Sequence, residues 1–94
     1  MRKIKCFIDF AKEEQWLQEM SRKGWRLAGV GFGYLFVPVP PQEATIRVDC
    51  RMFHKKSDYA DYLALFEDSG WVHLAGSAYS GTQYFQKAGE QAQD

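Results

Sequence analysis

Residues 16–25 read Trp-Leu-Gln-Glu-Met-Ser-Arg-Lys-Gly-Trp, and residues 62–71 read Tyr-Leu-Ala-Leu-Phe-Glu-Asp-Ser-Gly-Trp. The two stretches lie forty-six positions apart and share an aromatic–Leu pair, an apolar residue one helical turn later and a Gly-Trp ending. This spacing predicts an amphipathic helix, and the glycine predicts where the helix ends. We therefore expect one domain over 1–88, built from two pseudo-repeats at about 3–39 and 44–87, with a polar tail at 89–94.

The segments around each predicted helix alternate between apolar and polar residues, as strands do. Strands are predicted at 3–10, at 25–39 with an interruption near 29–33, at 44–53, and within 72–87 with a break around 76–81. Helices are predicted at about 11–23, capped by Asp9, and from a Ser57 N-cap to Gly70. The order β-α-β-β-α-β predicts an α+β, ferredoxin-like sandwich, in which a four-stranded antiparallel sheet carries both helices on one face.

Composition excludes several classes of protein. Twelve basic and twelve acidic residues cancel, so there is no global field that would attract nucleic acid or an anionic membrane. No stretch approaches the roughly 20 apolar residues of a membrane span, and we expect no direct membrane insertion. Cys6 and Cys50 lack metal-ligand spacing, so we interpret them as buried thiols that face the helices in a reducing cytoplasm.

The sequence offers few candidate catalytic residues or motifs. His54 and His73 have no metal-ligand spacing with Asp, Glu or Cys. The glycine-rich stretch 29–33 opens no helix and so fails the context test for a dinucleotide site. Ser80 and Cys50 have no evident histidine partner. We expect no catalytic residues, no metal, no cofactor and no enzyme activity.

One face of the predicted sheet is a candidate partner-binding surface. Alternation places Lys5 and Phe7 on this face from the first strand, and Arg47, Asp49 and Arg51 from the third. Alternating Arg and Asp also indicates cross-strand ion pairs on a solvated surface. An open face of this kind binds RNA in some ferredoxin-like modules, but alternate stacking aromatics are missing from the third strand and aspartates repel phosphate, so nucleic acid is disfavoured.

The two Gly-Trp pairs allow a structural and a functional interpretation. In the structural interpretation, Trp25 and Trp71 close the ends of the core. In the alternative interpretation, they line a pocket for a small ligand between helix and sheet. The basic loop His54-Lys55-Lys56 is expected to be solvated, with an anion at the following helix N-terminus as the alternative.

Several segments together resemble a known family. They are Phe7-Ile8-Asp9-Phe10, Glu13-Glu14-Gln15-Trp16-Leu17, Lys23-Gly24-Trp25, Arg47-Val48-Asp49-Cys50-Arg51, Tyr62-Leu63-Ala64-Leu65-Phe66-Glu67-Asp68-Ser69-Gly70-Trp71 and Tyr84-Phe85-Gln86-Lys87. Over about residues 3–88 the chain is similar to the DUF2812 family, a domain of unknown function from Gram-positive bacteria. The resemblance implies a neighbourhood of PadR-type regulators and fusion to membrane helices, although this chain has no spanning segment. It implies no catalytic residues.

The residues and the resemblance together favour a non-catalytic, cytoplasmic interaction or sensory module. Its expected partner is a protein, such as a PadR-type regulator or a membrane protein, or a second copy in a homodimer. The alternative, from a different class, is a small-ligand-binding domain with its pocket near Trp25 and Trp71. Single-stranded nucleic acid on the sheet face ranks third.

Overall fold

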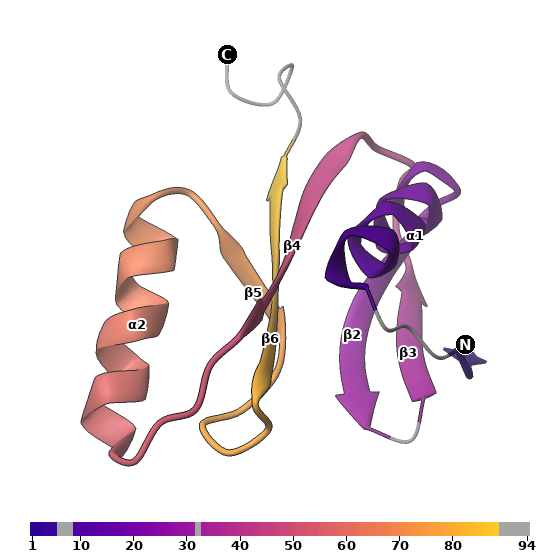
Figure 1. The fold of residues 1–94 in the computed structure, drawn as a ribbon. Coiled ribbons are helices and arrows are strands. Elements are labelled where there is room, and N and C mark those ends of the chain that lie inside the picture. The colour runs from indigo at the N-terminus through magenta and orange to yellow at the C-terminus, as the bar shows by residue number, and fades with distance from the viewer. Residues whose placement is uncertain (6–8, 32, 89–94) are drawn as a thin grey trace.

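A computed structural model describes residues 1–5, 9–31 and 33–88 of the chain. These residues form an α+β structure, as predicted (Figure 1). The helices are α1 (Phe10–Arg22) and α2 (Lys56–Asp68). The strands are β1 (Arg2–Lys3), β2 (Trp25–Gly31), β3 (Gly33–Pro38), β4 (Ala44–Cys50), β5 (Val72–Ala75) and β6 (Thr82–Ala88).

Both helices end where the sequence predicts. Gly24 follows α1 with a φ of 92°, and Gly70 follows α2 with a φ of 91°. Only glycine adopts this left-handed conformation without strain, so the chain leaves each helix at the same point of the repeated stretch. The start of α1 is also confirmed, because the Asp9 side chain accepts a hydrogen bond from the Ala11 N–H at 2.9 Å.

The predicted start of α2 is wrong. The helix begins at Lys56 and its N-cap is Lys55, which makes no side-chain capping hydrogen bond. Ser57 therefore lies inside the first turn. Asp58 in the same turn favours the helix through the dipole instead of through a cap.

Two predicted single strands are hairpins of two strands each, and this overturns the four-stranded sheet. The residues at 25–39 form β2 and β3, which pair antiparallel around Gly33, where φ is 85°. The residues at 72–87 form β5 and β6, which also pair antiparallel. A glycine interruption that suits a bulge also suits a complete reversal, because both need positive φ. The described residues therefore contain six strands instead of the four predicted.

The six strands form two three-stranded antiparallel sheets instead of one sheet. The first sheet has the order β1-β3-β2 and the second has the order β4-β6-β5. In both sheets the strand that is second along the chain, β2 or β5, lies at an edge of the sheet. In both halves the helix comes before the hairpin in the sequence. A register shift in β2 between Leu27 and Gly29 recurs in β5 between His73 and Ala75, forty-six positions later. We call residues 1–43 the first half and residues 44–88 the second half.

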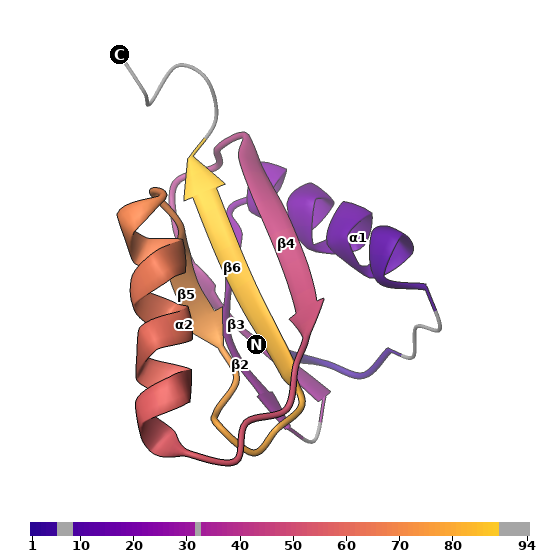
Figure 2. The ribbon, with the colours of Figure 1, turned by 60° about the vertical axis from the view of Figure 1, so that its left-hand side comes forward.

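The two helices lie on opposite faces of the second sheet, so the prediction of both on one face is wrong (Figures 1 and 2). Tyr84 and Phe85 are neighbours in β6 and therefore point to opposite faces. The core around Tyr84 contains residues from α1, the first sheet and the second sheet. The core around Phe85 contains Phe53 and Tyr62, with Trp71 among the side chains packed against it. The second sheet is thus covered by α2 on one face and by the first half on the other.

Side chains of α1 bind the backbone of β4 where the two halves meet. The Val48 N–H donates to the Glu14 carboxylate at 2.7 Å, and the Ile46 N–H donates to the Gln18 side-chain oxygen at 2.9 Å. These N–H groups lie at the edge of β4 that β6 does not occupy. The polar side of α1 therefore supplies acceptors that a missing neighbouring strand would otherwise provide.

A buried carboxylate also joins the halves. Glu13 is only 4% exposed, and its Oε2 accepts hydrogen bonds from the hydroxyls of Tyr34 at 2.6 Å and Tyr84 at 2.7 Å. The donors belong to different sheets, so one oxygen links α1 to both. Burial and the hydrogen bond to Glu13 raise the pKa of the Tyr84 hydroxyl well above its usual range, so this hydroxyl remains a donor.

Other predictions concern the N-terminal strand and the cysteines. The structure shows β1 as two residues, and the part of the predicted 3–10 strand that contains Cys6 and Phe7 lies outside the described residues. Cys50 is exposed, so its predicted burial is wrong. It is the last residue of β4, beyond the two hydrogen bonds to α1. Among the described residues, neither helix is long and apolar enough to cross a bilayer.

Candidate functional site

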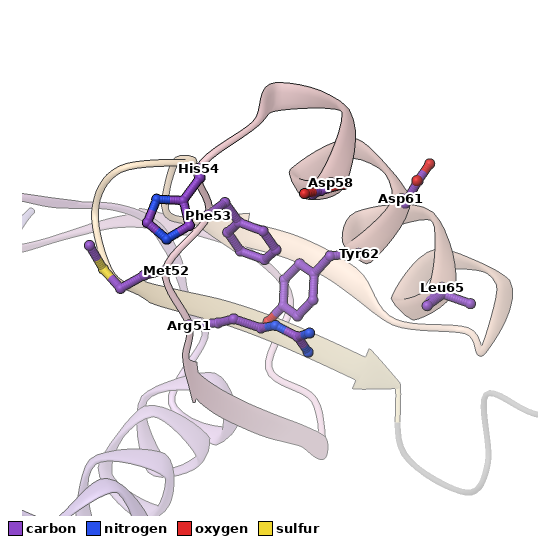
Figure 3. A pocket seen from close by; sticks show the side chains of 8 residues that line it. All are labelled: Arg51, Met52, Phe53, His54, Asp58, Asp61, Tyr62 and Leu65. Carbon is purple, nitrogen blue, oxygen red and sulfur yellow. The ribbon is translucent and has the colours of Figure 1, made fainter.

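A groove between α2 and β4 is the candidate site; we call it the α2–β4 groove. It contains two hollows, of about 350 Å³ and about 240 Å³, and Leu65 lines both. The first hollow is lined by Arg51, Met52, Phe53, His54, Asp58, Asp61, Tyr62 and Leu65 (Figure 3). The second is lined by Arg47, Leu65, Phe66, Ser69 and Trp71. The groove therefore combines an aromatic floor with cations on the strand side and carboxylates on the helix side.

Strand periodicity places the two arginines of the groove on the same side. Arg47 is paired directly with Phe85, whose side chain packs against α2, so both side chains point toward that helix. Residues 49 and 51 follow at intervals of two and extend this row. Figure 3 shows Arg51 reaching from the strand toward Tyr62.

Both arginines lie over aromatic rings of the core around Phe85. The guanidinium carbon of Arg51 lies 5.7 Å from the ring centre of Phe53 and 5.6 Å from that of Tyr62. That of Arg47 lies 6.0 Å from the ring centre of Phe66. Cation–π contacts at exposed sites contribute roughly 0.5–1 kcal/mol, so they orient the side chains while leaving their N–H donors accessible.

Asp49, between the two arginines, is bound to α2. Its Oδ2 accepts a hydrogen bond from the Tyr62 hydroxyl at 2.7 Å. Burial, followed by this hydrogen bond and the charge of Asp49, raises the pKa of Tyr62 well above its usual range. The hydroxyl therefore remains a donor, and Asp49 fixes α2 against the sheet.

Among the described residues, Arg47, Asp49 and Arg51 do not form the predicted cross-strand ion pairs. Within the described ranges, an ion pair joins Arg22 and Glu43 of the first half, whose Nη1 and Oε2 atoms lie 3.6 Å apart. Neither Arg47 nor Arg51 has a carboxylate at that distance in the part of the chain that the structure describes. The site thus presents two exposed guanidinium groups without a described acidic partner.

The predicted partner-binding residues are only partly brought together. Arg47, Asp49 and Arg51 share one face, but this face is not open as predicted, because α2 lies across it. Lys5 lies in the first half, with its Nζ 5.1 Å from the ring centre of Trp16 on α1. Phe7 lies outside the described residues.

The two tryptophans of the Gly-Trp pairs belong to different cores. Trp25 packs against the core between the halves, and Trp71 packs against the core beneath α2. Trp71 also lines a hollow of about 450 Å³ with Leu63, Glu67, Val72, His73 and Phe85. The Nζ of Lys87 lies 5.1 Å from the Trp71 ring centre. The structure therefore offers a hollow beside Trp71 without Trp25.

Sequence reasoning missed several residues of the site and its support. Leu65 is 69% exposed, and its position off the apolar stripe of α2 was the available signal. Gln83 is fully buried and accepts a hydrogen bond from the Tyr59 hydroxyl at 3.0 Å, while its amide donates to the Ser77 carbonyl at 2.7 Å. A glutamine in a strand carries no sequence signal for such a network.

The basic loop and the metal question complete the site. His54 lines the first hollow, while Lys55 and Lys56 are exposed. Among the residues that the structure describes, no group of three His, Cys, Asp or Glu side chains could hold a metal ion. The groove therefore offers hydrogen-bond donors and apolar surface to a binding partner.

The comparisons with known proteins give a family without an assigned activity. A family model with the description "Protein of unknown function (DUF2812)" matches residues 9–94. No curated protein and no solved structure matches the chain.

Proposed function

Because the chain belongs to the DUF2812 family, we propose that it is a non-catalytic, cytoplasmic regulatory module that binds a protein partner through the α2–β4 groove. One observation carries the proposal. Arg47 and Arg51 are exposed cations without a described carboxylate partner. Each arginine lines one hollow of the groove, and the exposed Leu65 lines both hollows.

The groove selects a partner of defined chemistry. Arg47 lies in β4 and Arg51 follows its last residue, so the two are four residue steps apart, which corresponds to about 13 Å along an extended chain. A segment with an apolar anchor flanked by two carboxylates at this separation matches the groove, because arginine binds carboxylate with two parallel hydrogen bonds. Asp58 and Asp61 on the opposite rim repel an acidic partner that shifts toward the helix and so define its orientation.

We propose a PadR-type regulator or a membrane protein as this partner. The experiment is pull-down from a cell lysate with wild-type bait, followed by a binding titration with the purified captured protein. Arg47→Ala/Arg51→Ala should lower the affinity about tenfold or more, because the partner's carboxylates lose their donors. Lys12→Ala/Lys23→Ala is the matched control, since both lysines are exposed cations outside the groove.

Two outcomes would count against this proposal. Equal affinity of the wild type and the double arginine variant would remove the groove from the interface. Loss of capture after nuclease treatment would replace the protein partner with a nucleic acid.

A second candidate function is small-ligand binding in the hollow beside Trp71. The 450 Å³ volume and the mixed lining of Trp71, Leu63, Glu67 and His73 favour it. Trp16→Phe/Trp25→Phe leaves Trp71 as the single tryptophan of the chain. A metabolite that shifts the fluorescence of this variant, with no shift in Trp71→Phe, would support the second function, and a flat response across a broad library would contradict it.

A further inference from the structure

The interface between the two halves has two sides. One side is the face of α1 that carries Glu14 and Gln18, which accept hydrogen bonds from the β4 backbone. The other side is the face of the second sheet that carries the directly paired residues Val48 and Tyr84. Both of these residues are buried, and the Tyr84 hydroxyl reaches Glu13 of α1.

Each side has an exposed counterpart elsewhere in the molecule. Glu14 and Gln18 correspond, forty-six positions later, to Ala60 and Ala64 of α2, which are both exposed. Val48 corresponds to Arg2, which lies forty-six positions earlier. Leu35 is the direct partner of Arg2 in the first sheet, as Tyr84 is the direct partner of Val48 in the second, so the pair Arg2–Leu35 corresponds to the pair Val48–Tyr84. Leu35 is 41% exposed, which is high for a strand leucine.

We call the exposed face of the first sheet its back face. It carries Arg2 and Leu35 from one cross-strand pair, and Arg26 and Val37 from another. α1 packs on the other face, where Trp16 contacts Tyr34 and Phe36 edge-on. Figure 1 shows α2 and the first sheet on opposite sides of the second sheet, so the two exposed counterparts cannot meet within one chain.

Charge on the two counterparts is complementary. Residues 1–43 contain seven basic and five acidic side chains, whereas α2 contains one basic side chain and four acidic ones. The last turn of α2 contains Glu67 and Asp68 and no basic residue. Carboxylates at a helix C-terminus are disfavoured by the helix dipole, so a cation supplied from outside stabilises them. The back face offers the exposed Arg26.

We propose that two copies of the chain associate head to tail, with the back face of the first sheet of one copy covering α2 of the next. The contact repeats between chains the arrangement by which the second sheet covers α1 within a chain. In this contact Ala60 and Ala64 allow the sheet to approach closely, and Glu67 and Asp68 face Arg26 of the neighbouring copy. The surface used is on the other side of α2 from Asp58 and Leu65, so the α2–β4 groove remains available.

A head-to-tail contact uses different surfaces on the two copies, so it continues until a ring closes or a chain grows. Sedimentation equilibrium from about 5 to about 500 μM covers the range expected for weak self-association. The weight-average mass should rise from the 10.9 kDa of one chain with concentration, and the rise should be smaller at high salt. A mass of 10.9 kDa throughout would overturn the proposal.

Charge reversal tests the orientation of the contact. Arg26→Glu and Glu67→Lys/Asp68→Lys should each raise the apparent dissociation constant about tenfold or more, because each places like charges together. An equimolar mixture of the two variants should regain association, since the reversed back face of one then meets the reversed helix of the other. A symmetric contact of α2 against α2 predicts instead that Arg26→Glu leaves the association unchanged, because Arg26 lies on β2.

Matched controls separate this effect from a general change in charge. Lys12→Glu and Glu19→Lys reverse exposed charges on α1, outside both counterpart surfaces, and should leave the association unchanged. Circular dichroism and the melting temperature show whether each variant folds. Folded Arg26→Glu or Glu67→Lys/Asp68→Lys that associates as strongly as the wild type overturns the proposal.

Discussion

α1 and α2 have the same length and occupy equivalent positions in the two halves, yet they are buried to very different extents. Four side chains of α1 are buried, including Glu13 and Leu17, whereas one side chain of α2 is buried, Tyr62. α1 lies between its own sheet and the second half, while α2 is covered by the second sheet alone. Equivalent sequence positions therefore contribute differently to the free energy of unfolding, because the burial of a helix depends on what packs against its second side.

The largest expected difference is between two equivalent leucines. Leu17 is buried in the core between the halves, whereas Leu63 is half-buried at the edge of the core around Phe85. Leu17→Ala should lower the free energy of unfolding by about 3 kcal/mol, and Leu63→Ala by about 1 kcal/mol. Urea unfolding of both variants measures the comparison. Equal losses would show that the two helices are equally important to stability.

The glycines that end the helices provide a second comparison. Both have positive φ, so alanine costs about 1–2 kcal/mol at either position. A Cβ at Gly24 would also lie 3.0 Å from the Val39 carbonyl oxygen, whereas at Gly70 its nearest neighbour is the flexible Lys87 side chain at 3.2 Å. Gly24→Ala should therefore cost about 1 kcal/mol more than Gly70→Ala in thermal unfolding. The reverse order would contradict the geometry.

The hydrogen bonds from β4 to α1 predict a third difference between equivalent positions. Glu14→Ala leaves the Val48 N–H without its acceptor and should destabilise the protein by about 1–2 kcal/mol. The reciprocal change at the equivalent position, Ala60→Glu, adds an exposed carboxylate and should remain within about 0.5 kcal/mol. Chemical denaturation of the two variants tests both values. A neutral Glu14→Ala would mean that water replaces the carboxylate.

The smallest effect is restricted to alkaline pH. Burial raises the pKa of Tyr84 and Tyr62 above that of the unfolded chain, where a tyrosine titrates near 10. The unfolded state therefore loses these protons first, and stability should fall as the pH rises above about 10. Tyr84→Phe and Tyr62→Phe should each reduce this slope. Melting temperatures between pH 8 and 11 provide the test, and an unchanged slope in both variants would assign the dependence to other groups.

The sequence predicted the local structure better than the arrangement. Asp9, Gly24 and Gly70 mark helix ends through interactions within a few residues, and the structure confirms them. The hairpins at 25–39 and 72–87 were predicted as single interrupted strands, because a glycine permits either a bulge or a reversal. That choice depends on distant partners, such as the pairing of β4 with β6.

The candidate site was predicted in its residues but not in its setting. Strand alternation placed Arg47, Asp49 and Arg51 on one face, as the structure has them. The prediction left this face open, because a ferredoxin-like sheet has both helices on the other side. With α2 placed over the arginine face, Leu65 and Phe53 join the site, and no local pattern signals this.

The acceptors that Glu14 and Gln18 provide to β4 have a consequence for the protein at high concentration. A strand edge with free N–H groups can add a strand from another molecule and begin the growth of a cross-β aggregate. Here two of those groups are already bound to helix side chains, which cannot propagate a sheet. α1 therefore blocks the addition of a further strand at this edge of β4, through one carboxylate and one amide side chain.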